Sequence, residues 1–442
     1  MYIKYYTTRD DGEGGTEFVV IDYTDVKNLS FAPQTDLTGD SLPINEFSVD
    51  VITTDEFHTG EVVELYDDMD QLWAHWFVYK AIRLSPEAVR VTARSWLDEL
   101  DHRKMDAEVF TATSAADAID DCFGGTASYY QISVALQFAT LTGFVPEQTA
   151  RERLQWILLA IGAYVRDVYV SKAYILPVDE TETLIPLNRT FMRPSLDLSE
   201  VVTAVKVTSY TFSQAASEAE WQANDSSYMF PLPWIATEQS VTLVNPNAPD
   251  DAPENVKELD GVYLVNSGNV SAITSRLAKY WFNRQAVSLG CINNRQYRPG
   301  DKVVGYTAED ALVVGYIQQA SFGFGKQARS TLKLIGVDNV TGAKLTVNYT
   351  HNNGRIGQAV YYFPVGYTYT IANPYVDRTF EGRRFVYAPD DATITGTMTA
   401  GDNTATQTYS VALEYYDKKL SVYSADSVTL QSGSGTSTGV IS

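Results

Sequence analysis

The alternation of apolar and polar side chains between Leu42 and Arg94 predicts a run of antiparallel strands. From Leu42 to Val51, the side chains of Phe47, Val49 and Val51 fall on one face, and acidic or hydroxyl side chains occupy the positions between them. This period of two is typical of a strand with one face against a core. Three further segments continue the pattern, namely Val63 to Leu65, Trp73 to Leu84 and Val89 to Arg94.

The order of these segments carries functional information. They read LPINEFSVDV, then GEVVELYDD, then a strand with Trp, then VRVTARSWLDELD. This order resembles the opening domain of bacteriophage baseplate hub and tail-tip proteins, and of the hubs of related contractile injection systems. The resemblance implies a small β-barrel at the start of the chain.

A helix is predicted to begin after Thr149. Thr149 and Glu152 have the spacing of a capping box, in which each side chain accepts a hydrogen bond from the backbone of the other. An apolar stripe follows at Leu154, Ile157, Leu158 and Ile161, and Gly162 supplies a C-terminal stop. We expect flanking strands from Tyr129 to Leu141 and from Val165 to Leu176. The segment RERLQWILLAIGAYV resembles the side domain inserted between the two barrels of the hub family.

A second β-rich region is predicted from about Pro194 to Gly336. It includes the alternating segment Val205 to Thr208 and a polar loop from Asn245 to Pro253. One helix is expected, with Ile273, Leu277, Tyr280 and Trp281 on its apolar stripe and Arg276, Lys279 and Arg284 in solvent. The closing pattern, from RPGDKVVGY to KLIG, resembles the strands that complete a second barrel in the hub family.

From Lys344 onward the sequence changes character. Segments such as LTVNY, NNG, VGYTYTI and ITGTMTAGDNTATQTYSV resemble the small β-grasp or mucin-binding-protein-type repeats of bacterial surface proteins. Tyr361, Tyr362, Tyr367 and Tyr369 have the chemistry to stack on sugars, although alternating tyrosines also pack across strands. The Gly, Ser and Thr residues at the end predict a flexible tail.

These patterns together predict a mainly β protein with an α/β insert. The expected architecture has two small β-barrels of tail-hub type, an inserted α/β domain, and a C-terminal β-grasp-like or β-sandwich domain. The expected boundaries are 1–105 for the first barrel, 106–194 for the insert, 195–339 for the second barrel, 340–425 for the C-terminal domain and 426–442 for the tail.

Charge narrows the range of partners. The 442 residues carry a net charge of −22, and residues 1–120 hold 25 acidic against 9 basic residues. Nucleic-acid phosphates and anionic membranes repel such a surface, so specific nucleic-acid binding is not expected. The acidic surface either confers solubility or lines a passage through which DNA moves without sticking. No apolar run approaches the roughly 18 residues of a membrane span, and the amino terminus lacks a signal-peptide pattern, so we expect synthesis in the host cytoplasm.

No recognisable catalytic, cofactor-binding or metal-binding residue emerges from the sequence. His58, His75, His102 and His351 are scattered, and Asp67, Asp68 and Asp70 lack the glycine of a calcium loop. Cys122 and Cys291 are interpreted as reduced core residues. The turn from Phe322 to Lys326 is predicted to close a hairpin, because its spacing is not that of a P-loop. Paired carboxylates for glycoside hydrolysis leave no fixed spacing, and we nominate none.

The hub resemblance implies a structural function rather than an enzyme. It implies a homotrimeric ring in a virion tail tip or baseplate, which joins the tail tube or distal tail protein to a central spike or tail fibre, near the tape measure protein, and lines the DNA passage during ejection. The alternative is a carbohydrate-binding tail adhesin, which attaches to a host surface glycan through the C-terminal domain. A tail-associated hydrolase is a third possibility.

Overall fold

The computed structural model describes most of the first 340 residues with their side chains. The described ranges are 2–7, 17–67, 70–125, 129–168, 170–178, 185–186, 194–224, 233–283, 285–292, 297–306, 312–324 and 328–340. Beyond them it describes only the backbone of strands, at 342–350, 356–364, 368–372, 376–380, 383–389, 393–399, 406–409, 413–417, 427–432 and 436–441. The chain divides into two compact units. The first comprises residues 1–180 and 199–284, and the second comprises 181–198 and 285–442.

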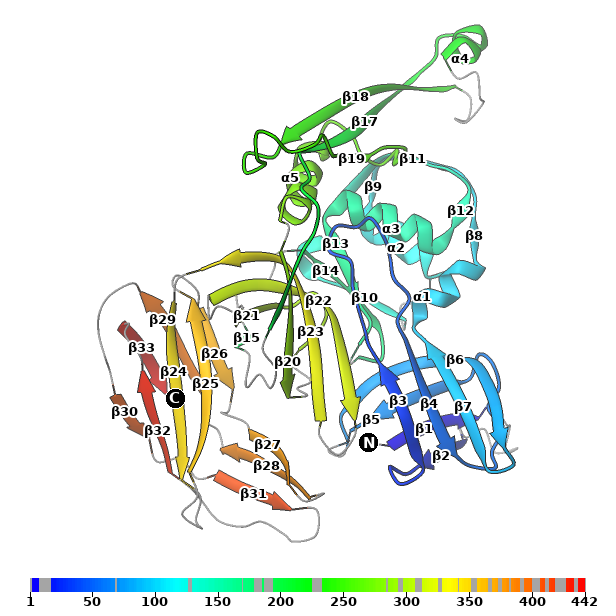
Figure 1. Ribbon diagram of the computed structural model, residues 1–442. Coiled ribbons are helices and arrows are strands. Elements are labelled where there is room, and N and C mark those ends of the chain that lie inside the picture. Colours follow the sequence, from blue (N-terminus) through cyan, green and yellow to red (C-terminus); the bar gives the residue numbers. More distant parts are fainter. Residues whose placement is uncertain are drawn as a thin grey trace. The chain divides into compact units, whose positions relative to one another are not determined.

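An antiparallel sheet, here called the N-terminal sheet, opens the first unit (Figure 1). Its hydrogen-bonded order is β3-β4-β7-β6-β5-β1-β2. The strands are β1 (Tyr2–Thr7), β2 (Glu17–Ile21), β3 (Val26–Phe31), β4 (Glu46–Ile52), β5 (Val62–Tyr66), β6 (Leu72–Ser85) and β7 (Ala88–Arg94). The alternation predicted for β4 is confirmed, because Phe47, Val49 and Val51 are buried.

The strand predicted from Leu42 begins later, at Glu46. Leu42 belongs to the apolar core of the segment that follows the sheet. The amide of Asn45 is committed to the backbone of Gln34, as donor to its carbonyl and as acceptor from its N–H. The Asn45 carbonyl still accepts from the Ser95 N–H at 2.9 Å, but regular pairing with β7 begins at Glu46, so periodicity alone places the start of β4 too early.

The next part of the first unit, here called the helical segment, spans residues 96–178. It contains α1 (Trp96–Glu99), η1 (Leu100–His102), β8 (Lys104–Met105), β9 (Glu108–Ser114), α2 (Ala115–Cys122), β10 (Tyr130–Ile132), η2 (Val134–Leu136), β11 (Thr140–Val145), β12 (Gln148–Thr149), α3 (Ala150–Ile161), β13 (Ala163–Arg166) and β14 (Ala173–Pro177). Helix α3 confirms the predicted cap and stop, with both capping-box hydrogen bonds formed and Gly162 in the left-handed region at φ 71°. The single strand expected from Tyr129 to Leu141 is wrong, because Ser133 caps the short helix η2 and interrupts it.

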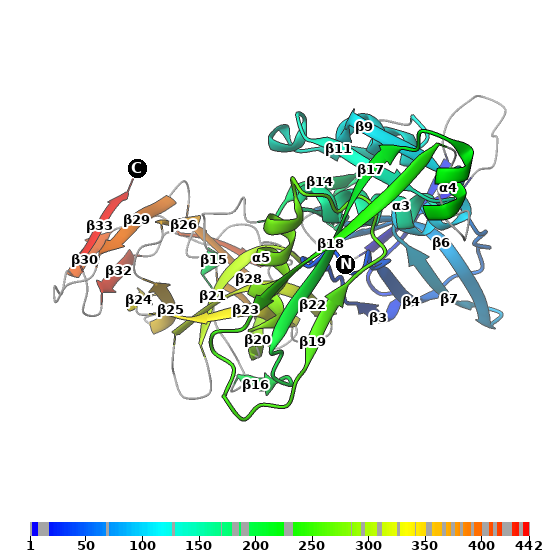
Figure 2. The same ribbon diagram turned by 90° about the horizontal axis from the view of Figure 1, so that it is seen from above.

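A ribbon completes the first unit. Its strands are β17 (Ala204–Gln214), β18 (Trp234–Val244) and β19 (Val256–Leu259), and helix α4 (Glu218–Asn224) stands at its far end in both views (Figures 1 and 2). The predicted helix is α5 (Val270–Trp281), and its buried stripe packs on the base of β17. Arg276 is not left in solvent as expected. It donates to the Leu159 carbonyl near the end of α3 at 2.5 Å.

The second unit contains the remaining strands. Those before the C-terminal region are β15 (Ile185–Pro186), β16 (Ser195–Leu198), β20 (Gln285–Ile292), β21 (Lys302–Tyr306), β22 (Leu312–Phe324) and β23 (Ala328–Asn339). Strands β22 and β23 pair antiparallel up to Phe324 and Ala328, which confirms the predicted hairpin, although residues 325–327 of its turn lie outside the described part. Residues 199–284 cluster with the first unit, so the compact units do not coincide with the predicted 195–339 domain, and those domain boundaries stay a prediction.

The described C-terminal elements are all strands. They are β24 (Gly342–Thr350), β25 (Ile356–Pro364), β26 (Thr368–Ala372), β27 (Val376–Phe380), β28 (Arg383–Pro389), β29 (Thr393–Thr399), β30 (Thr406–Tyr409), β31 (Leu413–Asp417), β32 (Ser427–Ser432) and β33 (Thr436–Ile441). The predicted flexible tail at 426–442 differs from the structure, because β32 pairs with β24 and β33 pairs with β29. The Thr and Val residues there favour extended backbone, which outweighs the Gly and Ser content. No helix in the described ranges has the length and apolarity to cross a bilayer.

The capping box of α3 gives a direct test of local stability. Thr149 Oγ accepts from the Glu152 N–H at 3.2 Å, and Glu152 Oε2 accepts from the Thr149 N–H at 2.9 Å. We expect Thr149→Ala to destabilise the first unit by about 1 kcal/mol in urea unfolding, and Thr149→Ser to be nearly neutral. Equal unfolding midpoints for Thr149→Ala and the parent would contradict this account of the helix start.

Candidate functional site

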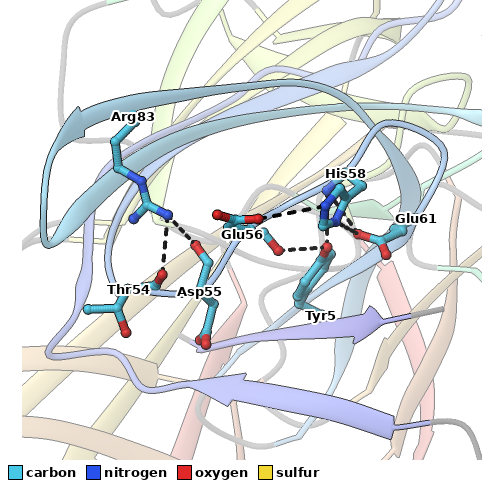
Figure 3. Close-up of polar contacts among 7 residues, drawn as sticks. All are labelled: Tyr5, Thr54, Asp55, Glu56, His58, Glu61 and Arg83. Atoms are coloured by element: carbon cyan, nitrogen blue, oxygen red, sulfur yellow. Dashed lines mark hydrogen bonds and ion pairs between the residues drawn. The ribbon is translucent and has the colours of Figure 1, made fainter. Parts of the chain in front are cut away.

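The loop between β4 and β5, residues 53–61, is the candidate contact site of the N-terminal sheet (Figure 3). One end of the loop is held by Arg83 from β6. The Arg83 guanidinium donates to the carbonyl oxygens of Thr53, Thr54 and Asp55 at 2.9, 3.2 and 2.7 Å. Three carbonyls bound by one planar cation fix the backbone of this turn.

The other end of the loop is held by Tyr5 from β1. The Tyr5 hydroxyl donates to the Glu56 carbonyl at 3.0 Å and accepts from the His58 N–H at 3.1 Å. The ring of Phe57 packs on the ring of Tyr5, with centroids 4.2 Å apart. The loop is therefore anchored at one end by the exposed Arg83 and at the other end by the buried Tyr5.

The anchored backbone presents Glu56 and His58 to solvent, with 74% and 60% of their side chains exposed. His58 Nδ1 lies 3.3 Å from Glu61 Oε2, and Nε2 lies 3.9 Å from Glu56 Oε2. An exposed imidazole between two carboxylates suits recognition of a partner by charge and hydrogen bonding. The described residues contain no group of three His, Cys, Asp or Glu side chains able to hold a metal ion.

A second polar network surrounds Glu64 on the outer face of β1, β5 and β6. Glu64 accepts from the Tyr6 hydroxyl at 2.6 Å and the Tyr66 hydroxyl at 2.9 Å, and it lies 2.7 Å from His75 Nδ1. Burial alone raises the pKa of Glu64, but the hydrogen bonds from His75, Tyr6 and Tyr66 outweigh burial and leave the pKa below its usual value. Burial together with the Glu64 carboxylate raises the pKa of Tyr6 to about 12.

In the acidic turn between β5 and β6, Asp67 has a structural role. Asp67 is buried, accepts from the Trp73 indole N–H at 3.1 Å and accepts from the Gln71 N–H at 3.0 Å. These bonds commit its carboxylate to closing the turn into β6. Asp68 and Met69 lie outside the described residues.

The remaining predicted residues are not brought together. Cys122 and Cys291 are free and buried, and burial raises the pKa of Cys122 to about 12 and that of Cys291 further, so neither thiol is a ready nucleophile. His102 ends η1, and His351 lies outside the described residues. The side chains of Tyr361, Tyr362 and Tyr369 and the whole of Tyr367 also lie outside the described part.

The sequence reasoning missed the anchored loop and the residue that holds it. No local pattern marks Arg83, because the second half of β6 is exposed and its carbonyl partners lie 28 to 30 positions away in the chain.

The comparisons with known proteins concern the fold. No protein-family model matches the chain, and no curated protein matches it. Among solved structures, a tail protein from Neisseria meningitidis is 12% identical, with a TM-score of 0.50 over 76% of this chain and 96% of that chain. A prophage tail protein from Listeria monocytogenes is 13% identical with a TM-score of 0.48, covering 75% and 94%. A prophage tail protein from Shewanella oneidensis is 7% identical with a TM-score of 0.48, covering 75% and 97%. The first of these shows that this chain shares its fold with a tail protein.

The anchored loop can be tested through Arg83. We expect Arg83→Ala to speed amide hydrogen exchange in residues 53–55 by about tenfold or more, because the three lost solvent-exposed hydrogen bonds together contribute at least about 1 kcal/mol. Lys80→Ala, on the same strand and exposed, is the matched control and should leave exchange unchanged. Equal protection of the loop in both variants would show that Arg83 does not hold it.

The Glu64 network predicts a specific loss of stability in acid. Because the folded-state pKa of Glu64 is lowered, its contribution is present above the unfolded value of 4.5 and is lost as the pH falls through the folded value. Glu64→Gln should therefore be less stable than the parent at pH 7, and the difference should shrink at pH 3 to 4 in chemical denaturation. Glu87→Gln, at an exposed position, is the control. A difference that stays constant with pH would contradict this role.

Proposed function

We propose that this chain is a structural hub protein of a phage-like tail tip or baseplate. In this proposal three copies form a ring that joins the tail tube or distal tail protein to a central spike or fibre. The observation that carries the proposal is the shared fold, which extends over 96% of the Neisseria tail protein. The order of sequence segments in the N-terminal sheet supports the same assignment independently of that comparison.

The distribution of the strands between the two compact units supports a ring assembly. The N-terminal sheet belongs to the first unit, and strands β20 to β23 belong to the second. Under the proposal these are the two barrels of each subunit, so three subunits supply six barrel positions to a sixfold tube. The first barrel, the insert and the second barrel would then follow the boundaries predicted from the sequence.

The surface chemistry supports an assembly role. The first 120 residues are strongly acidic, which suits a passage that DNA crosses without adhering. Val134 and Phe138 are 73% and 90% exposed on an ordered turn, although large apolar side chains are costly to leave in water. The solved structure that shares this fold is a tail protein, and we propose a structural rather than an enzymatic role for this chain.

Oligomeric mass tests this proposal. We expect the purified full chain to have three times the mass of one chain by native mass spectrometry and light scattering, over a tenfold dilution series. Negative-stain images should show rings. A monodisperse monomer at every concentration, with no ring in the images, would count against the hub function.

A further inference from the structure

Asp167 lies at the junction of the N-terminal sheet and the helical segment. It directly follows β13 and is 3% exposed. Asn45, just before β4, donates from Nδ2 to Asp167 Oδ1 at 2.7 Å. Trp76 of β6 donates from Nε1 to the Asp167 backbone carbonyl at 3.0 Å. One residue of the helical segment thus receives hydrogen bonds from two separate parts of the sheet.

The second carboxyl oxygen is not satisfied in the same way. Among the described residues, Asp167 Oδ2 makes no hydrogen bond, and the buried Ser95 Oγ makes none either. The Ser95 hydroxyl is nevertheless close enough to lower the pKa of Asp167. A buried carboxylate with one bare oxygen is costly when it is ionised, whereas the neutral acid carries a proton that it can donate.

Among the described residues, no cation is among the groups that shift the pKa of Asp167, so none stabilises its ionised carboxylate. Burial raises the pKa of Asp167 to about 6, and the opposing influences come from Ser95, Asn45 and the Asp167 backbone, none of which is charged. The charged groups on the elements packed around it are engaged elsewhere. Glu46 and Asp98 pair with Arg94, Asp50 pairs with Arg90, His75 pairs with Glu64, and Arg166 donates to Tyr164.

We propose that Asp167 is a pH-dependent latch, which holds the helical segment on the N-terminal sheet when it is protonated and loosens that junction when it ionises. The carboxyl lies buried beside Asn45 and Ser95, and these two neutral groups stabilise its ionised form less than burial destabilises it. This regulation goes beyond the hub function and does not depend on it.

The direction of the pH effect on the junction follows from the linkage between proton binding and stability. The folded pKa of about 6 is above the model value of 3.8, so the contribution of Asp167 to the junction is complete below pH 3.8 and is lost as the pH rises through 6. The two values differ by about two units, which corresponds to about a 100-fold increase in the opening equilibrium between pH well below 3.8 and pH well above 6, if opening exposes the carboxyl to water.

Hydrogen exchange on the full chain tests the latch. After correction for intrinsic rates, amides of residues 163–168 should lose protection by about 25-fold between pH 4.5 and pH 7.5, and the opening equilibrium should reach half of its high-pH value near pH 6. Asp167→Asn keeps the shape and removes the charge, so its corrected protection should be flat over this range. Residues 89–94 of β7 serve as the reference within the same molecule.

A second variant keeps the test open if Asp167→Asn does not fold. Ser95→Ala removes the hydroxyl that lowers the pKa of Asp167, so it should move the midpoint to higher pH. Flat protection in the parent, or the same pH profile in Asp167→Asn and the parent, would overturn the latch. The trimer measurement is separate, so failure of the latch leaves the hub function standing.

Discussion

Burial of Trp76 is the interaction on which the first unit depends. Its side chain is fully buried, and its ring packs against Phe31 and Phe47 with centroids 5.5 and 5.6 Å away. An indole in such a core must find an acceptor for its N–H. The acceptor is the backbone carbonyl of Asp167, 91 positions away in the chain. The core of the sheet therefore also fixes the position of the helical segment.

The other polar anchors follow the same principle at the edge of that core. Tyr5 is fully buried in the sheet, and its hydroxyl holds the loop at Glu56 and His58. Arg83 lies on the exposed half of β6 and holds the same loop through carbonyl oxygens. The Tyr5 contacts satisfy a buried hydroxyl, and both anchors position an exposed loop. In the proposed hub, a rigid loop of this kind would offer Glu56 and His58 to a neighbouring protein at little entropic cost.

The features that the sequence predicts well are those encoded locally. The burial of Phe47, Val49 and Val51 follows from a period of two, and the limits of α3 follow from Thr149, Glu152 and Gly162. The junction could not be predicted in this way, because Asn45 and Asp167 are 122 positions apart and no local pattern marks either residue. Arg276 shows the same limit, since its partner Leu159 is 117 positions away. Strands β32 and β33 lie in a segment whose Gly and Ser content predicts a tail, and alternating Thr and Val residues favour extended backbone there.

The proposed function holds that each subunit places two like sheets around a common axis, so that threefold assembly matches a sixfold tube. A cryo-electron microscopy reconstruction of the assembled full chain, refined without imposed symmetry, tests it most directly. The account predicts a threefold ring in which β1 to β7 and β20 to β23 occupy alternating, nearly equivalent positions about 60° apart. A reconstruction in which the two sheets lie at unrelated radii or have unlike topologies would contradict it.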